Sequence, residues 1–164
     1  MKQPLSADLP FAEGYVLPID KPLGWTSSDV VRKIKVMMRR LGHRKIKVGH
    51  AGTLDPLATG ILIVCLGRAT KQAEALQAQP KEYLTTLALG ATTPSFDMEH
   101  PVDRTFPYEH ITRQMLEEAL RTMEGEQMQL PPVYSAKSID GKRAYEYARQ
   151  GTEVEMRRAP VTVY

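Results

Sequence analysis

The 164-residue sequence contains one cysteine, few aromatic residues (7% of the chain) and no long apolar run. A single cysteine cannot form an internal disulfide, so nothing requires an oxidising compartment. Cys65 lies in the apolar run 61–66 and is interpreted as a small buried hydrophobe. No stretch approaches the roughly 20 apolar residues that cross a bilayer, and residues 1–10 lack the apolar core of a signal peptide. These absences favour a cytoplasmic protein without membrane association.

Metal and nucleotide motifs are also missing. His43, His100 and His110 form no ligand spacing with one another or with the cysteine. Glycines 49, 52 and 60 lack the Lys-Ser/Thr ending of a phosphate-binding loop. We therefore expect no metal and no cofactor.

Apolar residues make up 42% of the chain and charged residues 25%, a balance typical of globular proteins. Residues 1–13 have no periodic pattern and are expected to form a flexible N-terminal arm. Residues 14–164 are expected to form one domain. Periodic patterns predict its elements: strands at 15–19, 61–66, 82–89 and 160–164, and helices at 26–41, 69–79, 112–124 and 142–150.

The interleaved helices and strands predict an α+β fold with a mixed, mainly antiparallel sheet flanked by helices. Residues 49–56 and 91–108 are expected to be loops. The helix at 112–124 has an apolar face that should pack inward, formed by Met115, Leu116, Ala119, Leu120 and Met123.

Charge is distributed unevenly. Residues 30–54 contain no acidic side chain, although the formal net charge of the whole chain is only +3. The cations in this segment are Arg32, Lys33, Lys35, Arg39, Arg40, Arg44, Lys45 and Lys47. Several cations on one side of an element suit a polyanion, because each neutralised phosphate releases counterions. A solvated helix face is the alternative interpretation.

A second cluster combines cations with aromatic rings, an arrangement that suits looped RNA with exposed bases. Its cations are Lys137, Lys142, Arg143 and Arg149, and its rings are Tyr134, Tyr145 and Tyr147. The tyrosines could instead be core residues of a short helix.

One carboxylate, Asp55, lies in the glycine-lined segment 49–60 between the basic residues and the strand predicted at 61–66. Loops held on rigid strands commonly present catalytic groups. Taken alone, Asp-Pro is also an ordinary turn initiator, and His50 could be a turn histidine without a functional role.

Several motifs, in order and at matching separations, resemble the bacterial tRNA pseudouridine synthase B (TruB) family over nearly all of 15–164. They are Asp20–Ser27 (DKPLGWTS), Gly49–Gly60 (GHAGTLDPLATG), Gly67–Lys71 (GRATK), Lys81–Tyr83 with Leu89–Gly90, Pro131–Lys137 (PPVYSAK) and Arg143–Gly151 (RAYEYARQG). One departure is Ala51, where the family more often has threonine.

The resemblance implies a role for each matching residue. Asp55 would be the catalytic aspartate, His50 a contact to the target nucleotide, Tyr83 the ring that stacks on uracil, and Lys21 a support of the catalytic loop. Residues 131–151 would form a thumb that grips the T-arm of tRNA. Arg39, Arg40, Arg44 and Lys45, together with the thumb cations, would bind RNA.

The resemblance also implies the pseudouridine synthase fold and an isomerase that converts the T-loop uridine, position 55 of tRNA, to pseudouridine. No obligatory protein partner is expected. The alternatives are a noncatalytic tRNA-binding or tRNA-folding module and a guide-RNA-dependent relative, which the segment 57–60 and the thumb disfavour.

Family members continue into a strand whose arginine pairs with the catalytic aspartate. The alternating pattern at 160–164 has no stop signal, so we expect a truncated domain, with little or no turnover by these 164 residues alone.

Overall fold

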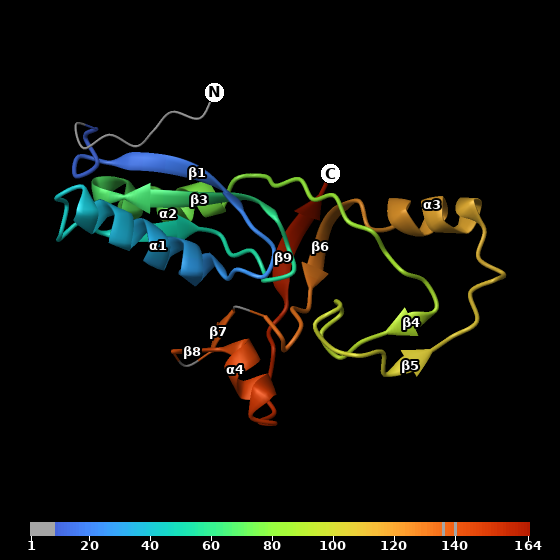
Figure 1. Cartoon of the computed structure of the whole chain (residues 1–164). Coiled ribbons are helices and arrows are strands. Elements are labelled where there is room, and N and C mark those ends of the chain that lie inside the picture. The colour runs from blue at the N-terminus through green and yellow to red at the C-terminus, as the bar shows by residue number, and fades with distance from the viewer. Residues whose placement is uncertain (1–8, 136, 140) are drawn as a thin grey trace. The chain divides into compact units, whose positions relative to one another are not determined.

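The computed structural model describes residues 9–135, 137–139 and 141–164. For Arg143, only the backbone is described. The chain divides after Leu84 into two compact units, called unit 1 and unit 2 (Figure 1). Each unit is described by itself. The expectation of one domain over residues 14–164 stays a prediction.

Unit 1 contains a three-stranded antiparallel sheet in the order β1-β3-β2. Its strands are β1 (Tyr15–Lys21), β2 (Val48–Ala51) and β3 (Gly60–Leu66). The strands predicted at 15–19 and 61–66 are confirmed. The prediction of a loop over residues 49–56 is wrong for its first three residues, because β2 continues to Ala51. Pairing with β3 satisfies the backbone N–H and C=O groups of β2, which a loop would leave to solvent.

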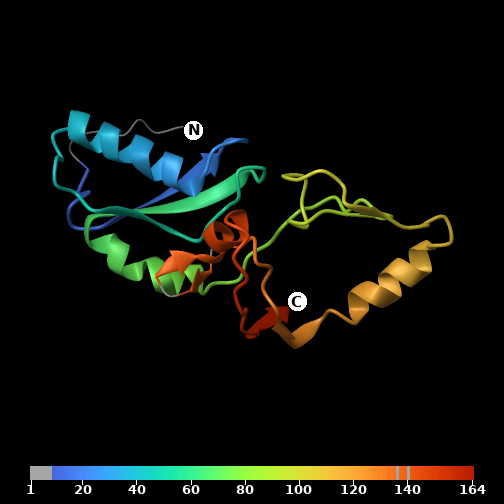
Figure 2. The same ribbon diagram turned by 90° about the horizontal axis from the view of Figure 1, so that it is seen from below.

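Helix α1 (Ser27–Arg40) begins at a capping box in which Thr26 and Asp29 satisfy each other's backbone N–H groups. Apolar residues three and four apart form its buried stripe, and they join the side chains of β3 in the core. The stripe consists of Val30, Ile34 and Met38, and β3 contributes Leu62, Val64 and Leu66. The helix predicted over 26–41 is confirmed. Figure 2 shows α1 and α2 on opposite sides of the sheet.

Residues 9–13 differ from the loosely held arm that was expected, whereas residues 1–8 lie outside the described residues. The Phe11 side chain is 0% exposed and belongs to the core of unit 1. Its ring packs edge-on against Tyr15 and His43, each with ring centroids 5.4 Å apart. Burial of this ring in the core ties residues 9–13 to unit 1, so structure begins before Gly14.

Residues 67–89 depart from two predictions. The helix expected at 69–79 is a 3-10 helix, η1 (Gly67–Gln72), followed by the short helix α2 (Ala73–Gln77). The strand expected at 82–89 is wrong, because residues 80–88 have no regular structure. Their alternation supplies one apolar face, but a strand also requires a hydrogen-bonded neighbour, and none of the described strands pairs with them.

Unit 2 consists of short elements and two-stranded antiparallel sheets. Strands β4 (Ala91–Thr92) and β5 (Arg104–Thr105) pair within the segment expected to be a loop. Strand β6 (Gly125–Gln129) pairs with β9 (Ala159–Val163), which confirms the C-terminal strand. The thumb segment holds β7 (Ser138–Ile139), β8 (Lys142–Arg143) and α4 (Ala144–Arg149).

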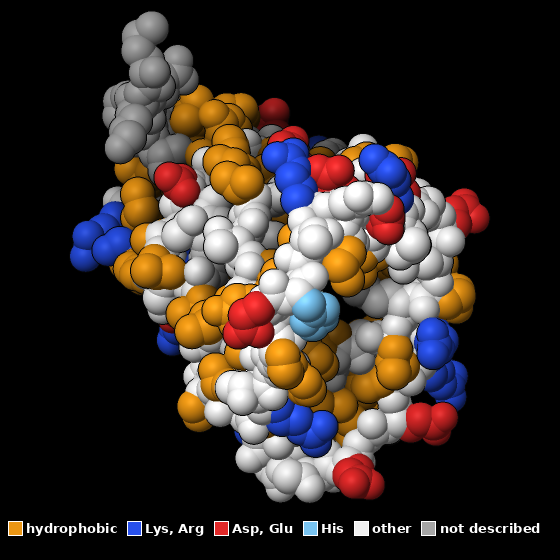
Figure 3. Space-filling view, turned by 90° about the vertical axis from the view of Figure 1, so that its right-hand side faces the viewer, with side chains coloured by type: hydrophobic (Ala, Val, Ile, Leu, Met, Phe, Trp, Pro, Cys, Tyr) orange, Lys and Arg blue, Asp and Glu red, His pale blue; other side chains and the backbone are white. Residues whose placement is uncertain are grey.

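Helix α3 (Arg113–Arg121) confirms the helix expected at 112–124, and Thr112 caps it through its hydroxyl. The predicted inward packing is wrong, because Met115, Leu120 and Met123 are exposed. A local pattern fixes a helix and its apolar face, but not the layer that covers that face. Figure 3 shows apolar side chains at the surface on one side of the molecule.

Within the described part of the chain, no helix combines the length and apolar character needed to cross a membrane.

Candidate active site

Asp55 lies in the loop that joins β2 to β3, called the aspartate loop (residues 52–59). The Asp55 carbonyl oxygen accepts a hydrogen bond of 3.0 Å from the Ala58 N–H, which closes a turn with Pro56 at its second position. Proline is favoured there because its ring presets the backbone angle. The Asp55 side chain is exposed. The turn therefore places one aspartate at the exposed surface of a sheet-anchored loop.

The strand register brings Lys21 to the same end of the sheet. Lys21 closes β1 and pairs with Gly60, the residue at which the aspartate loop enters β3. The Lys21 side chain is 0% exposed. Its ammonium nitrogen donates hydrogen bonds to the carbonyl oxygens of Trp25, Pro22 and Pro56 at 2.6, 3.1 and 3.5 Å. An ammonium group has three donors, and burying it without partners would cost several kcal/mol. The three carbonyl oxygens provide a partner for each donor of Lys21.

The aspartate loop is also held by two residues that the sequence interpretation did not single out. The Gly24 N–H donates a 2.8 Å hydrogen bond to the Pro56 carbonyl oxygen, from a backbone with φ of +78° that glycine adopts without strain. The Ser27 hydroxyl accepts a hydrogen bond from the Leu54 N–H at 3.0 Å and donates one to the Leu54 carbonyl oxygen at 3.1 Å. Ser27 continues the buried stripe of α1. Its place on that apolar stripe was the sequence signal that could have identified it as a buried hydroxyl.

His50 lies on β2 opposite Val64 and is half-buried, so it is a strand residue rather than a turn residue. Its Nδ1 contacts the carbonyl oxygen of Gly52, at the start of the aspartate loop. Such a contact fixes the ring and distinguishes its two nitrogens. The expected contact of His50 with a nucleotide stays a prediction.

Tyr83 lies in the irregular segment 80–88, and its side chain is 71% exposed. A ring this exposed is available for stacking. Its stacking role stays a prediction.

The predicted RNA-binding cations of unit 1 are exposed. Arg39 and Arg40 occupy the last turn of α1, while Arg44 and Lys45 follow in the connection to β2. Cations at a helix C-terminus also interact favourably with the helix dipole, so part of this charge has a structural use. Binding of RNA by these residues stays a prediction.

The thumb cations have partners within unit 2. The Lys137 ammonium donates to the Arg157 carbonyl oxygen at 3.1 Å, and the Lys142 ammonium lies 5.7 Å from the Tyr147 ring centroid. Arg149 lies 5.3 Å from the Tyr145 ring centroid and forms a 2.8 Å ion pair with Glu99. The Arg143 side chain lies outside the described residues.

Two groups of unit 1 have shifted pKa values. Hydrogen bonds from the Thr26 hydroxyl and the Thr26 N–H, followed by the nearby Arg32 charge, hold the pKa of the Asp29 carboxyl below its usual range. Burial raises the pKa of the Cys65 thiol, which agrees with its prediction as a buried hydrophobe. Within the described ranges, no three His, Cys, Asp or Glu side chains gather where they could hold a metal ion.

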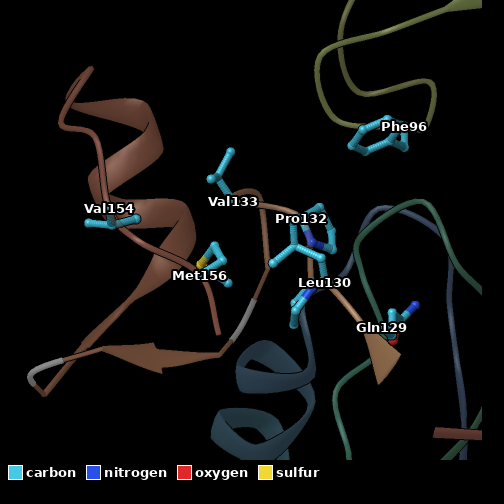
Figure 4. Close-up of a pocket in the computed structure, with 8 residues that line it drawn as sticks. Phe96, Gln129, Leu130, Pro132, Val133, Val154 and Met156 are labelled. Carbon is cyan, nitrogen blue, oxygen red and sulfur yellow. The ribbon is translucent and has the colours of Figure 1, made fainter. Parts of the chain in front are cut away.

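An open pocket of about 640 Å³ lies in unit 2 (Figure 4). Its lining is mainly apolar and includes Phe96, Leu130, Pro132, Val133, Val154 and Met156. Phe96 has a φ of 61°, an uncommon conformation for a bulky residue. The lining includes no ionisable side chain, so the pocket alone supplies no acid, base or nucleophile.

The antiparallel α+β architecture, with its sheet-anchored loop and its one carboxylate, belongs to the pseudouridine synthase fold class, as a comparison with solved structures shows. A solved structure agrees with this fold class. The chain matches a chain of the "Crystal Structure of a Cbf5-Nop10-Gar1 Complex" with a TM-score of 0.50 and 26% identity, covering 82% of this chain and 33% of that one.

Residues 39–164 match the family model described as TruB family pseudouridylate synthase (N terminal domain). The chain belongs to this family, as the sequence motifs indicated.

Curated relatives named tRNA pseudouridine synthase B support the assignment. The one from Phocaeicola vulgatus is 60% identical over 148 residues, which cover 90% of this chain and 63% of that protein. The one from Bacteroides fragilis is 57% identical, with 90% and 64% covered, and the one from Flavobacterium johnsoniae is 47% identical, with 94% and 68% covered. The chain thus spans about two thirds of the length of these relatives.

Proposed function

We propose that the protein is a tRNA pseudouridine synthase that isomerises the T-loop uridine, position 55 of tRNA, with Asp55 as its catalytic carboxylate. The observation that carries the proposal is the way in which the aspartate loop is held. Buried Lys21 and Ser27 bond the residues on either side of Asp55, while the Asp55 side chain itself is exposed. A fixed backbone with an accessible carboxylate suits attack on a bound substrate.

The proposed reaction breaks the bond between the ribose and the uracil nitrogen, turns the base and rejoins it through carbon. The carbon that forms the new bond loses its proton, and the nitrogen that was released gains one, so there is no net oxidation or hydrolysis. The Asp55 carboxylate would act as a nucleophile at the sugar or as a base towards it. Tyr83 would hold the detached uracil by stacking, and His50 would contact the target nucleotide.

The target uridine is stacked within a folded T loop, so it must be flipped into the site at a cost of a few kcal/mol. Phosphate contacts would offset that cost. The exposed side chains of Arg39, Arg40, Arg44 and Lys45 supply positive charge for such contacts in unit 1. The thumb segment, residues 131–151, would add cations and rings from unit 2.

The test is tritium release from unmodified tRNA labelled at uracil C5, together with mapping of the product to position 55. The full-length wild-type protein is expected to release tritium from this position alone. A noncatalytic tRNA-binding or tRNA-folding module would bind the same tRNA and release none. Absence of both release and tRNA binding at low salt would contradict either function.

A further inference from the structure

Among the residues that the structure describes, the buried polar or charged side chains are Lys21 and Ser27. The Ser27 hydroxyl directs both of its hydrogen bonds to one residue, Leu54. It accepts from the Leu54 N–H at 3.0 Å and donates to the Leu54 carbonyl oxygen at 3.1 Å. A hydroxyl has a single donor, and here that donor is used on the peptide group that joins Leu54 to Asp55.

The backbone on the other side of Asp55 is also held. The Pro56 carbonyl oxygen accepts a 2.8 Å hydrogen bond from the Gly24 N–H. Residues 24–27 therefore bond the chain both before and after Asp55. The orientation of the Asp55 backbone, and with it the direction in which its side chain leaves the loop, depends on these bonds.

Ser27 is mounted on a rigid element. It is the first residue of α1 and lies on the same buried stripe as Val30 and Ile34, which pack in the core of unit 1. Its side chain is 3% exposed and thus shielded from the RNA that an exposed Asp55 would meet. An effect of Ser27 on the reaction must therefore pass through the backbone of the aspartate loop.

We infer that Ser27 is a positioning residue for catalysis: its paired hydrogen bonds with Leu54 orient Asp55 towards the sugar of the target uridine. This inference rests on the proposed function. Misplacing a reacting group by about 1 Å costs on the order of 100-fold in rate without requiring weaker binding. Loss of the Ser27 hydroxyl therefore lowers the rate of the chemical step and leaves tRNA affinity unchanged.

The experiment measures single-turnover rates of pseudouridine formation and tRNA dissociation constants in the full-length protein. The variants are Ser27→Ala, Ser27→Thr and Ser28→Ala. Ser28 is the neighbouring serine of α1 and is exposed, so it is a matched control. Ser27→Ala is expected to lower the rate about 100-fold, with the dissociation constant within about twofold of wild type. Ser27→Thr retains the hydroxyl and is expected to recover most of the rate, and Ser28→Ala to match wild type.

Thermal unfolding followed by circular dichroism shows whether each variant is folded at the assay temperature. If Ser27→Ala is unfolded there, Ser27→Cys takes its place, because a thiol keeps the side-chain shape but is a weak hydrogen-bond partner. The same loss of rate is expected for that variant.

Two outcomes would overturn the inference alone: an active wild type with Ser27→Ala as fast as Ser28→Ala, or a Ser27→Ala defect confined to tRNA affinity. A wild-type protein that forms no pseudouridine would contradict the proposed function together with the positioning role.

Discussion

The ammonium nitrogen of Lys21 lies 2.6 Å from the carbonyl oxygen of Trp25, in a side chain with no solvent exposure. The same nitrogen reaches the Pro56 carbonyl oxygen at 3.5 Å. One buried cation thus joins the end of β1, the turn before α1 and the aspartate loop. The energetic importance of this contact is open to direct measurement.

Lys21→Met keeps the length of the side chain but removes its three donors, so the hydrogen bonds to the carbonyl oxygens of Trp25, Pro22 and Pro56 are lost. We expect the free energy of unfolding to fall by about 3 kcal/mol, measured by urea denaturation. Lys35→Met, an exposed lysine of α1, is the control and should change the free energy by less than about 0.5 kcal/mol. Equal effects of the two substitutions would contradict the supporting role of Lys21.

The capping box of α1 predicts a dependence of stability on pH. Because the folded-state pKa of Asp29 is lowered, its contribution is complete above its unfolded pKa of about 3.9 and is lost as the pH falls through the lower folded value. The difference in unfolding free energy between wild type and Asp29→Asn should therefore shrink as the pH falls below about 4. Thr26→Ala removes the main cause of the shift and should reduce this pH dependence. A difference that stays constant from neutral to acidic pH would refute the assignment.

The exposed cations after α1 predict the salt dependence of tRNA binding. The double substitution Arg44→Ala with Lys45→Ala should reduce the slope of log affinity against log salt by about 1.5, since each phosphate contact contributes about 0.7–0.9. The control, Arg113→Ala with Arg121→Ala, removes the same charge from α3. If both pairs change the slope equally, the effect is one of net charge and not of a binding surface.

Tyr83 predicts a separation of catalysis from stability. In the full-length protein, Tyr83→Ala should lower kcat/KM about 10- to 100-fold, because stacking of a base on an aromatic ring contributes about 1–3 kcal/mol. The ring is 71% exposed, so the unfolding free energy should change by less than about 0.5 kcal/mol. Tyr83→Phe keeps the stacking surface and is the matched control for the hydroxyl. Full activity of Tyr83→Ala would remove this residue from the site.

Signals from nearby residues were sufficient to predict α1 and β3. The Thr26 hydroxyl, the apolar spacing from Val30 to Met38 and the following Gly42 predicted α1 nearly to the residue. The apolar run 61–66 likewise predicted β3, which pairs on both of its edges. In both elements, the apolar residues that identify the element lie within a few positions of one another in the sequence.

Predictions failed where the outcome depends on a partner that is distant in sequence. Residues 82–89 alternate as a strand would, but no described strand pairs with them, whereas the glycine-containing residues 48–51 form β2 because β3 accepts them. The exposed face of α3 is a failure of the same kind. A local sequence pattern indicates which secondary structure a segment prefers, but it does not identify the segment that pairs with it or covers it.

The candidate site divides in the same way. Asp55 and Lys21 were predicted from the family motifs, while the Ser27–Leu54 pair was not, since it joins residues 27 positions apart. A serine on an apolar stripe indicates a buried hydroxyl, but sequence alone does not identify the backbone groups that it bonds.

The central claim is that Asp55 performs chemistry and does not merely bind RNA. The most direct measurement compares, in the full-length protein, single-turnover tritium release and tRNA affinity for Asp55→Asn and for Asp20→Asn, an exposed aspartate of β1 with the same change of charge. Asp55→Asn is predicted to lose at least about 1,000-fold in rate, with tRNA affinity within about threefold of wild type, while Asp20→Asn stays active. An Asp55→Asn protein that releases tritium within tenfold of the wild-type rate would contradict the account.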